Sequence, residues 1–359
     1  MKIALVYDRV NKWGGAERVL LTLHEIWPEA PLFTAVHNPK KASWSDVFKV
    51  NPSFLNKFPL ASSHHEFYPW FTPLAFESFD LNSFDIVISV TSADAKGIIT
   101  PPSVFHICYC LTPTRYLYSG RNDYFKGIKK IVFSPVINYL KAWDRVASFR
   151  PDSFISISET VQKRIKKYYQ QESKTIYPPI ETDKWQLEEK QREDFYLVVS
   201  RLVEYKRVDL AINAFNKLGK KLVIVGDGRA RKKLEAMAKK NILFLGQLTD
   251  EELLRYYQKS KALIFAQLED FGLVSLEAQS CGTPVIAFSK GGAMETVIDK
   301  RTGLFFNKQT KESLMRAVKE FERLEIKSIN CRQNALRFNK ERFKKEFKKE
   351  VLNQWMRQK

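Results

Sequence analysis

Short apolar runs alternate with longer segments of helical periodicity along nearly the whole chain. Runs rich in β-branched and aromatic residues predict strands at residues 2–7, 85–90, 104–110, 153–157, 195–200, 221–225, 242–245, 262–266 and 284–288. Continuous apolar runs of this kind suit strands that are buried on both faces, as in a parallel sheet. Segments with apolar positions three or four residues apart predict helices at residues 16–27, 161–169, 209–218, 230–239, 250–260 and 273–281. Strands that alternate with helices in this way predict an α/β class with doubly wound parallel sheets.

A proline pair divides this alternation into two series. Pro178 and Pro179 disfavour helix and stiffen the chain, and the segment 181–194 that follows is polar and charged. The chain has 359 residues, more than the about 250–300 residues that one hydrophobic core usually reaches, so two domains are expected. The predicted parts are a first domain at residues 1–177, a second domain at residues 178–335 and a C-terminal helix at residues 336–359.

Net charge is the unusual feature of the composition. The sequence has 59 Lys and Arg against 40 Asp and Glu, which gives a net charge of +19. Such an excess points to a polyanionic partner, either nucleic acid or an anionic membrane face. Residues 115–150 combine cations with aromatic residues, and segments of this kind can lie on an anionic bilayer. The C-terminal helix is also basic, with an apolar stripe formed by Phe343, Phe347, Val351 and Trp355.

Cysteine content and the length of the apolar runs indicate the compartment. The four cysteines are too few and too scattered for a disulfide framework or a structural zinc site, which fits a reducing cytoplasm. The first apolar run is too short for a signal peptide. The longest uncharged stretch, residues 97–114, contains three prolines and a histidine and fails as a transmembrane helix. The sequence therefore predicts a cytoplasmic protein, with any membrane contact peripheral.

Two cations follow the first predicted strand of the second domain. In open parallel sheets, ligands bind beyond the carboxyl ends of the strands. Arg201 leaves this strand end directly, and Lys206 follows five positions later. Two converging cations suit a diphosphate, because Arg offers a planar fork and Lys a compact point charge. Taken alone, a pair of solvated surface cations is the simpler interpretation.

Two carboxylates follow the strand predicted at residues 262–266. Glu269 and Glu277 have seven residues between them. We expect Glu269 in the loop at the end of the strand and Glu277 about two turns into the next helix. A carboxylate can accept hydrogen bonds from two vicinal hydroxyls of a sugar or ribose. The start of this helix presents amides that can bind an anionic or hydroxyl ligand, those of Asp270, Phe271, Gly272 and Leu273.

Glycine turns follow two other strands. Gly14 and Gly15 open the first helix, where free backbone amides can approach a phosphate. Gly226 and Gly228 form a Gly-x-Gly without a third glycine, which favours a glycine turn near a nucleotide over a dinucleotide fingerprint. Either turn alone is also explained as a tight connection between a strand and a helix.

Several common catalytic patterns do not occur in the sequence. There is no Gly-x-x-x-x-Gly-Lys phosphate loop, no Asp-x-Asp pair, no zinc-type Cys or His grouping and no Gly-x-Ser-x-Gly elbow. Kinase-like, metallohydrolase and serine-hydrolase chemistry therefore lose their support. Paired carboxylates, two cations suited to phosphate and glycine turns remain, without a metal site. A nucleotide-sugar transferase would use these groups.

Taken together, these motifs resemble the family-four retaining glycosyltransferases of the GT-B fold, and the similarity spans almost the whole chain. The resemblance is carried by residues 14–17, 200–202 with Lys206, 225–228, 244–246, 269–278, 282–287, and Gly291 and Gly292 followed by Glu295. More narrowly, residues 108–116 and 143–145 resemble bacterial mannosyltransferase-like members that build O-antigen or exopolysaccharide.

The resemblance implies two Rossmann-like domains that face each other across a cleft, with the C-terminal helix crossing back to the first domain. It implies a nucleotide-diphosphate sugar as donor, with GDP-mannose favoured, and a lipid-linked oligosaccharide as acceptor. It also implies retention by front-face attack, without a metal or another cofactor. The protein would then be peripheral on the inner face of the cell membrane, with an anionic membrane surface and not nucleic acid as its partner.

The same resemblance assigns roles to the candidate residues. Arg201 and Lys206 would neutralise the diphosphate, which matters because the leaving group gains negative charge in the transition state. Glu269 would hold sugar hydroxyls and Glu277 the ribose hydroxyls, while the amides of residues 271–273 orient the sugar. Gly15 would let the backbone of the first domain close on the phosphates.

One position departs from the family pattern. Leu111 stands where the family usually has the histidine of His-Thr-Pro, and His106 is expected to be a hydrogen-bonded core residue. Because Leu111 replaces the family's histidine, one alternative is that the protein is a scaffold subunit that binds the donor but does not turn it over. The net charge alone leaves open the alternative of a nucleic-acid-binding protein with a Rossmann-like core, although the sequence contains no RNA- or DNA-binding signature. The aromatic stretch 67–74 could contact a lipid-linked acceptor, but we favour a packed connection.

Overall fold

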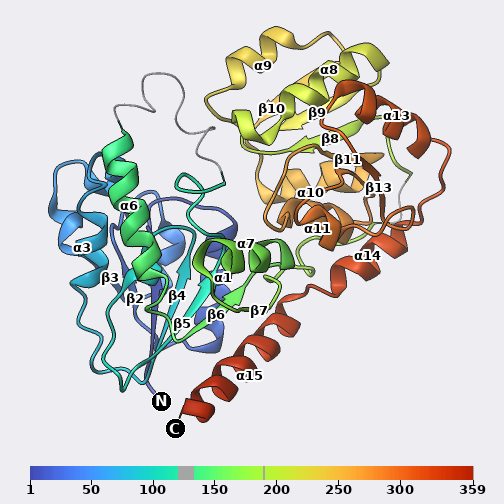
Figure 1. The fold of residues 1–359 in the computed structure, drawn as a ribbon. Coiled ribbons are helices and arrows are strands. Elements are labelled where there is room, and N and C mark those ends of the chain that lie inside the picture. Colours follow the sequence, from blue (N-terminus) through green and yellow to red (C-terminus); the bar gives the residue numbers. More distant parts are fainter. Residues whose placement is uncertain (120–132, 189–190, 359) are drawn as a thin grey trace. The chain divides into compact units, whose positions relative to one another are not determined.

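A computed structural model describes residues 1–119, 133–188 and 191–358 of the chain. The chain divides into two compact units, one of Met1–Pro179 with Glu341–Lys359 and the other of Ile180–Lys340 (Figure 1). Each unit is built on one parallel β-sheet covered by helices. The predicted fold class, α/β with two parallel-sheet Rossmann-like domains, is therefore confirmed.

The sheet of the first unit has seven strands in the order β3-β2-β1-β4-β5-β6-β7, and all its strand pairs are parallel. Its central strands are mostly apolar and are buried at every position, as expected for a parallel sheet covered on both faces. These are β1 (Ile3–Tyr7), β4 (Ile86–Thr91) and β5 (Phe105–Cys110). The outer strands are β2 (Leu32–Thr34), β3 (Val50–Pro52), β6 (Ser153–Ser156) and β7 (Lys174–Thr175).

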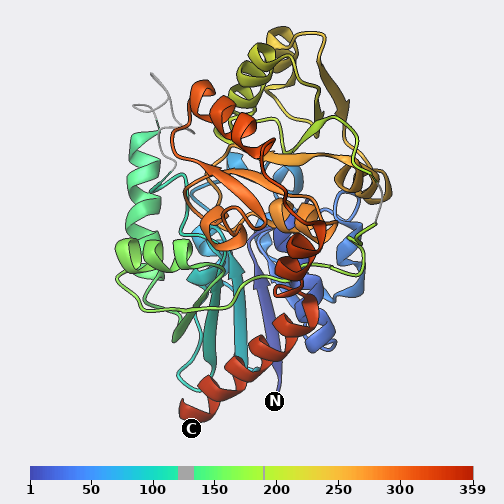
Figure 2. The ribbon, with the colours of Figure 1, turned by 90° about the vertical axis from the view of Figure 1, so that its right-hand side faces the viewer.

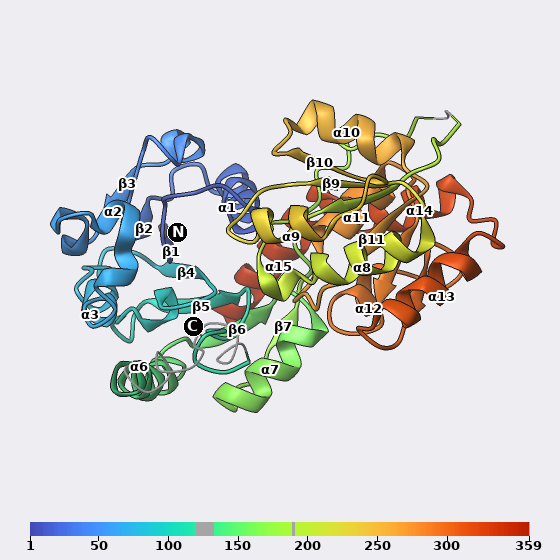
Figure 3. The ribbon, with the colours of Figure 1, turned by 90° about the horizontal axis from the view of Figure 1, so that it is seen from above.

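Helices cover both faces of this sheet (Figure 3). One face carries α2 (Ala61–His64), α3 (Thr72–Glu77) and α6 (Ser134–Ala147). The other face carries α1 (Gly15–Ile26) and α15 (Lys340–Gln358), and α7 (Glu159–Tyr169) lies near the β6 edge. Short 3-10 turns occur at Ser43–Val47, Phe54–Lys57, His65–Phe67 and Ala95–Gly97. No helix in the described ranges is long and apolar enough to cross a membrane.

The C-terminal helix α15 lies across the strands of the first unit (Figure 2). Its predicted apolar stripe makes the contact, since Phe343, Phe347 and Val351 are completely buried. The Tyr109 ring of β5 lies 5.9 Å from the Phe343 ring and 5.3 Å from the Phe347 ring, both edge-on. Aromatic pairs at such distances add to the stability gained from burial. The last segment of the chain is thus part of the core of the first unit.

The sheet of the second unit has six parallel strands in the order β10-β9-β8-β11-β12-β13. The strands are β8 (Tyr196–Val199), β9 (Leu222–Val225), β10 (Ile242–Gly246), β11 (Ala262–Phe265), β12 (Val285–Phe288) and β13 (Gly303–Phe306). The helices are α8 (Val208–Leu218), α9 (Arg231–Met237), α10 (Asp250–Lys259), α11 (Leu273–Ser280), α12 (Ala293–Thr296), α13 (Lys311–Phe321) and α14 (Ser328–Leu336), with a 3-10 turn at Glu204–Lys206. Helices α8 and α13 share one apolar core with the strands.

The sequence analysis missed four strands and several helices, among them α6, α13 and α14. Strands β2, β3 and β7 have only two or three residues, too few for a clear apolar run, whereas β13 is as long as several strands that were predicted. β3 also contains Pro52, and a strand with a proline is tolerated here because β3 is an edge strand of the sheet. Part of the basic and aromatic region at residues 115–150 lies outside the described residues.

The aromatic stretch 67–74 is only partly packed, so the interpretation that we favoured is wrong for half of its side chains. Phe67 is 64% exposed, Trp70 47% and Leu74 50%. Leu74 is exposed because α3 buries its other face, including Thr72 and Pro73, against the first unit, whereas Phe67 and Trp70 lie in the segment before α3. Exposure on one side of a short helix could not be read from an aromatic run without periodicity.

Candidate functional site

Most of the candidate residues lie at one edge of the second sheet. All its strands run in parallel, so their carboxyl ends meet at the same edge. The loops after β8, β9, β11 and β12 carry the predicted cations, glycines and carboxylates. Ligands of open α/β sheets bind in this position.

The structure brings Lys206 and Glu269 together, although 63 positions separate them in the sequence. The Nζ atom of Lys206 donates a hydrogen bond to Oε1 of Glu269 in an ion pair, and both side chains are mostly buried. Lys206 ends the 3-10 turn after β8, and Glu269 lies in the loop after β11, next to β8 in the sheet. A cation and a carboxylate predicted from separate loops therefore form one site.

Arg201 is held by a residue that the sequence analysis missed. Its Nη2 atom donates a hydrogen bond of 2.7 Å to the hydroxyl of Tyr205. The Tyr205 ring also lies 5.3 Å from Nζ of Lys206, within the range of a cation–π contact. Tyr205 thus contacts both cations and orders the loop between them. Its position between the two cations in the sequence was the signal that could have identified it.

Glycines shape the loop that carries Glu269. Gly272 has φ of +98°, and a Cβ there would come within 2.9 Å of the Phe265 ring. A Cβ on Gly292 would lie 2.3 Å from the Phe271 backbone, while the Gly292 amide donates to the carbonyl of Glu269 at 2.9 Å. The loop after β12 therefore packs directly on residues 269–271. The first turn of α11 begins at once with Leu273, and the first amides of a helix in general have no intrahelical acceptors.

Glu277 lies one turn inside α11 and not two, because the left-handed Gly272 delays the start of the helix to Leu273. Glu277 is buried, and its Oε2 atom accepts a hydrogen bond of 3.0 Å from the hydroxyl of Tyr257 on α10. A donor on a carboxylate orients it, so Tyr257 positions Glu277. Because Tyr257 comes from another helix, no local pattern in the sequence pointed to it.

Gly226 is required by the close approach of two loops. Its φ is +124°, and a Cβ there would lie 2.0 Å from the carbonyl oxygen of Ser200. The Leu202 amide donates to the Asp227 carbonyl at 2.9 Å, so the glycine turn after β9 is tied to the Arg201 loop. The predicted Gly-x-Gly turn therefore packs against the loop that carries Arg201 and stabilises it.

The glycine loop of the first unit starts α1. Gly14 is the N-cap in an extended conformation, and Gly15 is the first residue of the helix. Glu17 in the first turn is buried and accepts a hydrogen bond of 2.6 Å from the hydroxyl of Tyr7. A carboxylate is favourable at the N-terminus of a helix because its negative charge interacts with the positive end of the helix macrodipole. Gly14 and Gly15 belong to the first unit, whereas the other candidate residues belong to the second.

A buried polar cluster lies behind the loop after β5 in the first unit. Lys96 and Asp144 form an ion pair, and both side chains are almost completely buried. Asp144 also accepts hydrogen bonds from the hydroxyls of Thr114 at 2.7 Å and Tyr118 at 3.0 Å. Removal of one partner from such a pair is costly, since a charge would remain buried alone. The cluster fixes the chain that follows Leu111.

His106 is a core residue, as predicted. It is completely buried in β5, and its Nε2 atom lies 2.8 Å from Oγ of Ser89. Burial, with a smaller effect of Arg150, lowers the pKa of His106 to about 3. A histidine in this environment is neutral and structural at neutral pH.

The low pKa of His106 predicts a pH dependence of stability. Below pH 6.5 the unfolded chain binds a proton at this histidine and the folded chain does not, so acidification between pH 6.5 and 3 favours unfolding. Each pH unit in this window costs about 1.4 kcal/mol per group. We expect the stability advantage of the natural protein over His106→Gln to shrink by that slope in urea unfolding from pH 6 to 4. Replacement of the exposed His64 by Gln is the control, and an advantage that is equal at all pH values would contradict the assignment.

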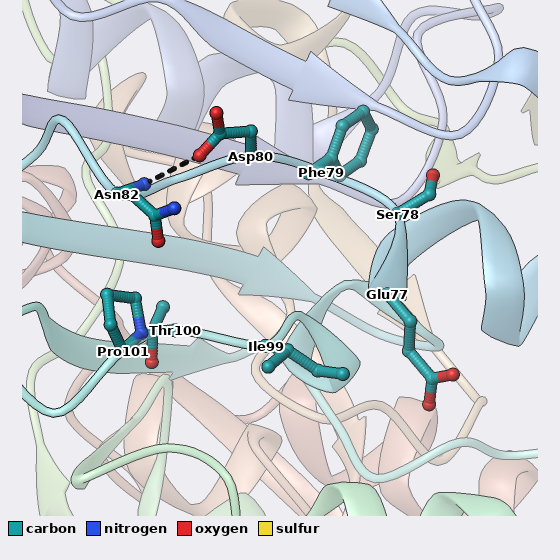
Figure 4. Close-up of a pocket in the computed structure, with 8 residues that line it drawn as sticks. All are labelled: Glu77, Ser78, Phe79, Asp80, Asn82, Ile99, Thr100 and Pro101. Carbon is teal, nitrogen blue, oxygen red and sulfur yellow. Dashed lines mark hydrogen bonds between the residues drawn. The ribbon is translucent and has the colours of Figure 1, made fainter.

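One depression of the first unit does not belong to the candidate site. Figure 4 shows its lining residues, among them Glu77, Asp80 and Asn82. They lie before β4 and β5, at the amino ends of the strands and opposite the edge where ligands bind. Glu77 is already bound by Trp143 at 2.7 Å and by Arg150 at 2.6 Å.

Comparison with known proteins finds a family model that matches the second unit. Residues 179–338 match the model for glycosyl transferases group 1. An uncharacterized glycosyltransferase of Methanocaldococcus jannaschii is 28% identical over 201 residues, which cover 55% of this chain and 57% of that protein. The GDP-mannose-dependent alpha-(1-6)-phosphatidylinositol monomannoside mannosyltransferase of Mycolicibacterium smegmatis is 33% identical over 140 residues, 33% of this chain and 36% of that protein. The chain thus spans little more than half of the first relative and about a third of the second.

Solved structures show the same fold over nearly the whole chain. The lipopolysaccharide outer core galactosyltransferase WaaB aligns with a TM-score of 0.69 at 18% identity, covering 99% of this chain and all of that one. HepE of Anabaena in complex with UDP aligns with a TM-score of 0.72 at 17% identity, covering 98% of this chain and all of that one. The fold is therefore the GT-B fold of glycosyltransferases.

Proposed function

We propose that this chain, which carries a group 1 glycosyltransferase domain on a GT-B fold, is a retaining and metal-independent hexosyltransferase. Its favoured donor is GDP-mannose, and its acceptor is a lipid-linked glycan in bacterial surface polysaccharide synthesis, at the inner face of the membrane. The observation that carries the proposal is the pairing of Lys206 with Glu269 at the ligand edge of the second sheet. The GDP-mannose dependence of the mycobacterial relative supports the choice of donor.

The site would supply positive charge where the nucleoside diphosphate leaves the sugar. Lys206 and Arg201 would bind the diphosphate and stabilise the negative charge that develops as the glycosidic bond breaks. Two cations in place of a metal ion would make the reaction metal-independent. The Glu269 carboxylate would accept hydrogen bonds from sugar hydroxyls, and the amides of Asp270 to Leu273 would orient the sugar. Glu277, oriented by Tyr257, would hold the ribose hydroxyls.

Donor binding would rearrange the ion pair. In the structure, Lys206 and Glu269 are paired with each other. A diphosphate offers Lys206 a stronger partner, and Glu269 is then available for the hydroxyls of the sugar. In front-face attack, the leaving phosphate oxygen takes the proton of the acceptor hydroxyl on the face from which it departs, so the anomeric configuration is retained.

A thermal-shift panel tests the donor class. A ligand that binds the folded state raises the melting temperature by mass action. We expect GDP and GDP-mannose to stabilise the protein more than UDP, UDP-glucose, UDP-galactose or UDP-N-acetylglucosamine, with equal shifts in EDTA. A larger shift with the UDP sugars would reassign the donor, and shifts abolished by EDTA would contradict metal independence. No shift with any nucleotide would contradict the proposal as a whole.

A further inference from the structure

A basic pocket lies in the first unit between α6, α7 and the loop after β5. It has a volume of about 480 Å³. Among the described residues, its lining contains three cations and no carboxylate. The lining residues are Leu117, Tyr118, Lys141, Arg145, Lys167, Tyr168 and Gln170. Within the described ranges, none of its three cations forms an ion pair with an acidic side chain.

Two stacked tyrosines form an ordered wall of the basic pocket. The rings of Tyr118 and Tyr168 lie 4.7 Å apart and are nearly parallel, at 22°. The Nζ atoms of Lys141 and Lys167 lie 5.5 Å from the Tyr118 and Tyr168 rings, respectively. The Tyr118 hydroxyl donates to the buried Asp144 at 3.0 Å. The tyrosines therefore hold the cations in place, and the buried cluster anchors this wall.

An exposed apolar surface adjoins the pocket along α6. One side of this helix is buried in the first unit. Lys141 and Arg145 are one helical turn apart and line the pocket on the side of α6 that faces α7. Toward α3, the Tyr139 ring packs at 5.9 Å from the Trp70 ring, and both side chains remain almost half exposed. Leu74 and Val146 are exposed by half or more of their surface. Figures 1 and 3 both show α3 and α7 on either side of α6.

Ordinary surface effects explain only part of this arrangement. A lysine in the last turn of a helix is favourable because its positive charge interacts with the negative end of the helix macrodipole. This effect accounts for Lys167 near the end of α7. The same effect does not explain Lys141, and it does not explain why aromatic and aliphatic side chains stay exposed beside it. Exposed apolar side chains next to cations are typical of proteins that bind the surface of a bilayer.

We propose that this α6 surface, formed by the basic pocket together with Trp70, Leu74, Tyr139 and Val146, docks on an anionic phospholipid bilayer. The pocket would hold a lipid phosphate, which Arg145 can bind as a fork and the two lysines as point charges. The aromatic rings would lie at the level of the headgroups. The inference deepens the proposed membrane association by naming the surface and its ligand. It depends on no residue of the sugar-nucleotide site.

Vesicle binding by matched variants of the full chain tests this surface. The pocket variant combines Lys141→Gln, Arg145→Gln and Lys167→Gln. The control variant combines Lys232→Gln, Lys233→Gln and Lys239→Gln, which remove three exposed cations of the second unit. In co-sedimentation with phosphatidylcholine vesicles that contain phosphatidylglycerol, we expect the pocket variant to bind roughly a hundredfold more weakly, and the control to bind nearly as the natural protein does.

A second variant tests the apolar part. Trp70→Ser with Tyr139→Ser is expected to lower the affinity for vesicles with and without phosphatidylglycerol, whereas the pocket variant loses affinity only for the anionic ones. Equal losses in the pocket and control variants would overturn the proposal, because the attraction would then follow net charge alone. Tight binding of free pyrophosphate or of an oligonucleotide to the pocket, without vesicle binding, would also overturn it. Thermal shifts with GDP-mannose are expected to be unchanged in the pocket variant, so this proposal can fail while the transferase proposal stands.

Discussion

Replacement of Glu269 by Gln is expected to lower kcat for sugar transfer by roughly 10²–10³-fold, while the fold stays intact. The glutamine removes a charged acceptor for the hydroxyls of the reacting sugar. It also deprives Lys206 of its ion-pair partner. Because Lys206 no longer needs to leave a carboxylate to bind a diphosphate, the affinity for GDP is expected to rise in the same variant. Loss of turnover together with tighter product binding is a signature that unfolding would not produce.

Steady-state kinetics and isothermal titration with GDP measure the two effects. Glu251→Gln is the matched control, since it removes an exposed carboxylate from α10 in the same unit. Turnover of Glu269→Gln equal to that of the natural protein would remove Glu269 from the site. Weaker GDP binding in this variant would contradict the proposed competition within the ion pair.

Arg201→Ala is expected to weaken binding of GDP and of GDP-mannose alike, by about 10–100-fold. A hydrogen bond to a charged group contributes about 1.5–3 kcal/mol, and Arg201 would contribute such bonds to the diphosphate that both ligands share. Tyr205 fixes the guanidinium at present, so Tyr205→Phe is expected to cause a smaller loss in the same direction. Titration calorimetry with both ligands separates this effect from one on the sugar.

Arg316→Ala serves as the control for Arg201→Ala. Arg316 is an exposed residue of α13 in the same unit, and its removal changes the net charge by the same amount. Unchanged affinities for GDP and UDP in Arg201→Ala would contradict a diphosphate site at this loop. A loss for GDP-mannose without a loss for GDP would move Arg201 from the diphosphate to the sugar.

The sequence was sufficient for the fold class and for the loops that carry the site. Continuous apolar runs such as that of β5 identify buried strands, and the rule that ligands bind beyond their carboxyl ends selects the loops. This logic places Lys206 and Glu269 at the same edge of the sheet, since both loops follow parallel strands, and in the structure these two strands are neighbours. Each residue was therefore predictable, but their direct contact was not.

Contacts between distant helices could not be predicted. Tyr257 reaches Glu277 from another helix, and Lys96 reaches Asp144 across 48 positions, because packing and not periodicity sets these distances. The exposed side of α3 has the same origin, since an aromatic run does not say which of its rings the core will cover. A single sequence therefore indicates secondary-structure elements and the sheet edge that binds ligands better than it indicates which side chains contact each other.

The most direct test of the account is the transfer reaction itself. The protein would be incubated in EDTA with GDP-mannose and a polyprenyl-diphosphate-linked glycan in anionic vesicles, and the new glycosidic bond would be identified by NMR. We expect a product with the anomeric configuration of the donor, formed roughly 10²–10³-fold more slowly by Glu269→Gln. A product of inverted configuration would contradict the retaining mechanism. Nucleotide binding without transfer to any acceptor would contradict the central claim and favour a donor-binding scaffold, for which Leu111 at the family's histidine position is the sequence signal.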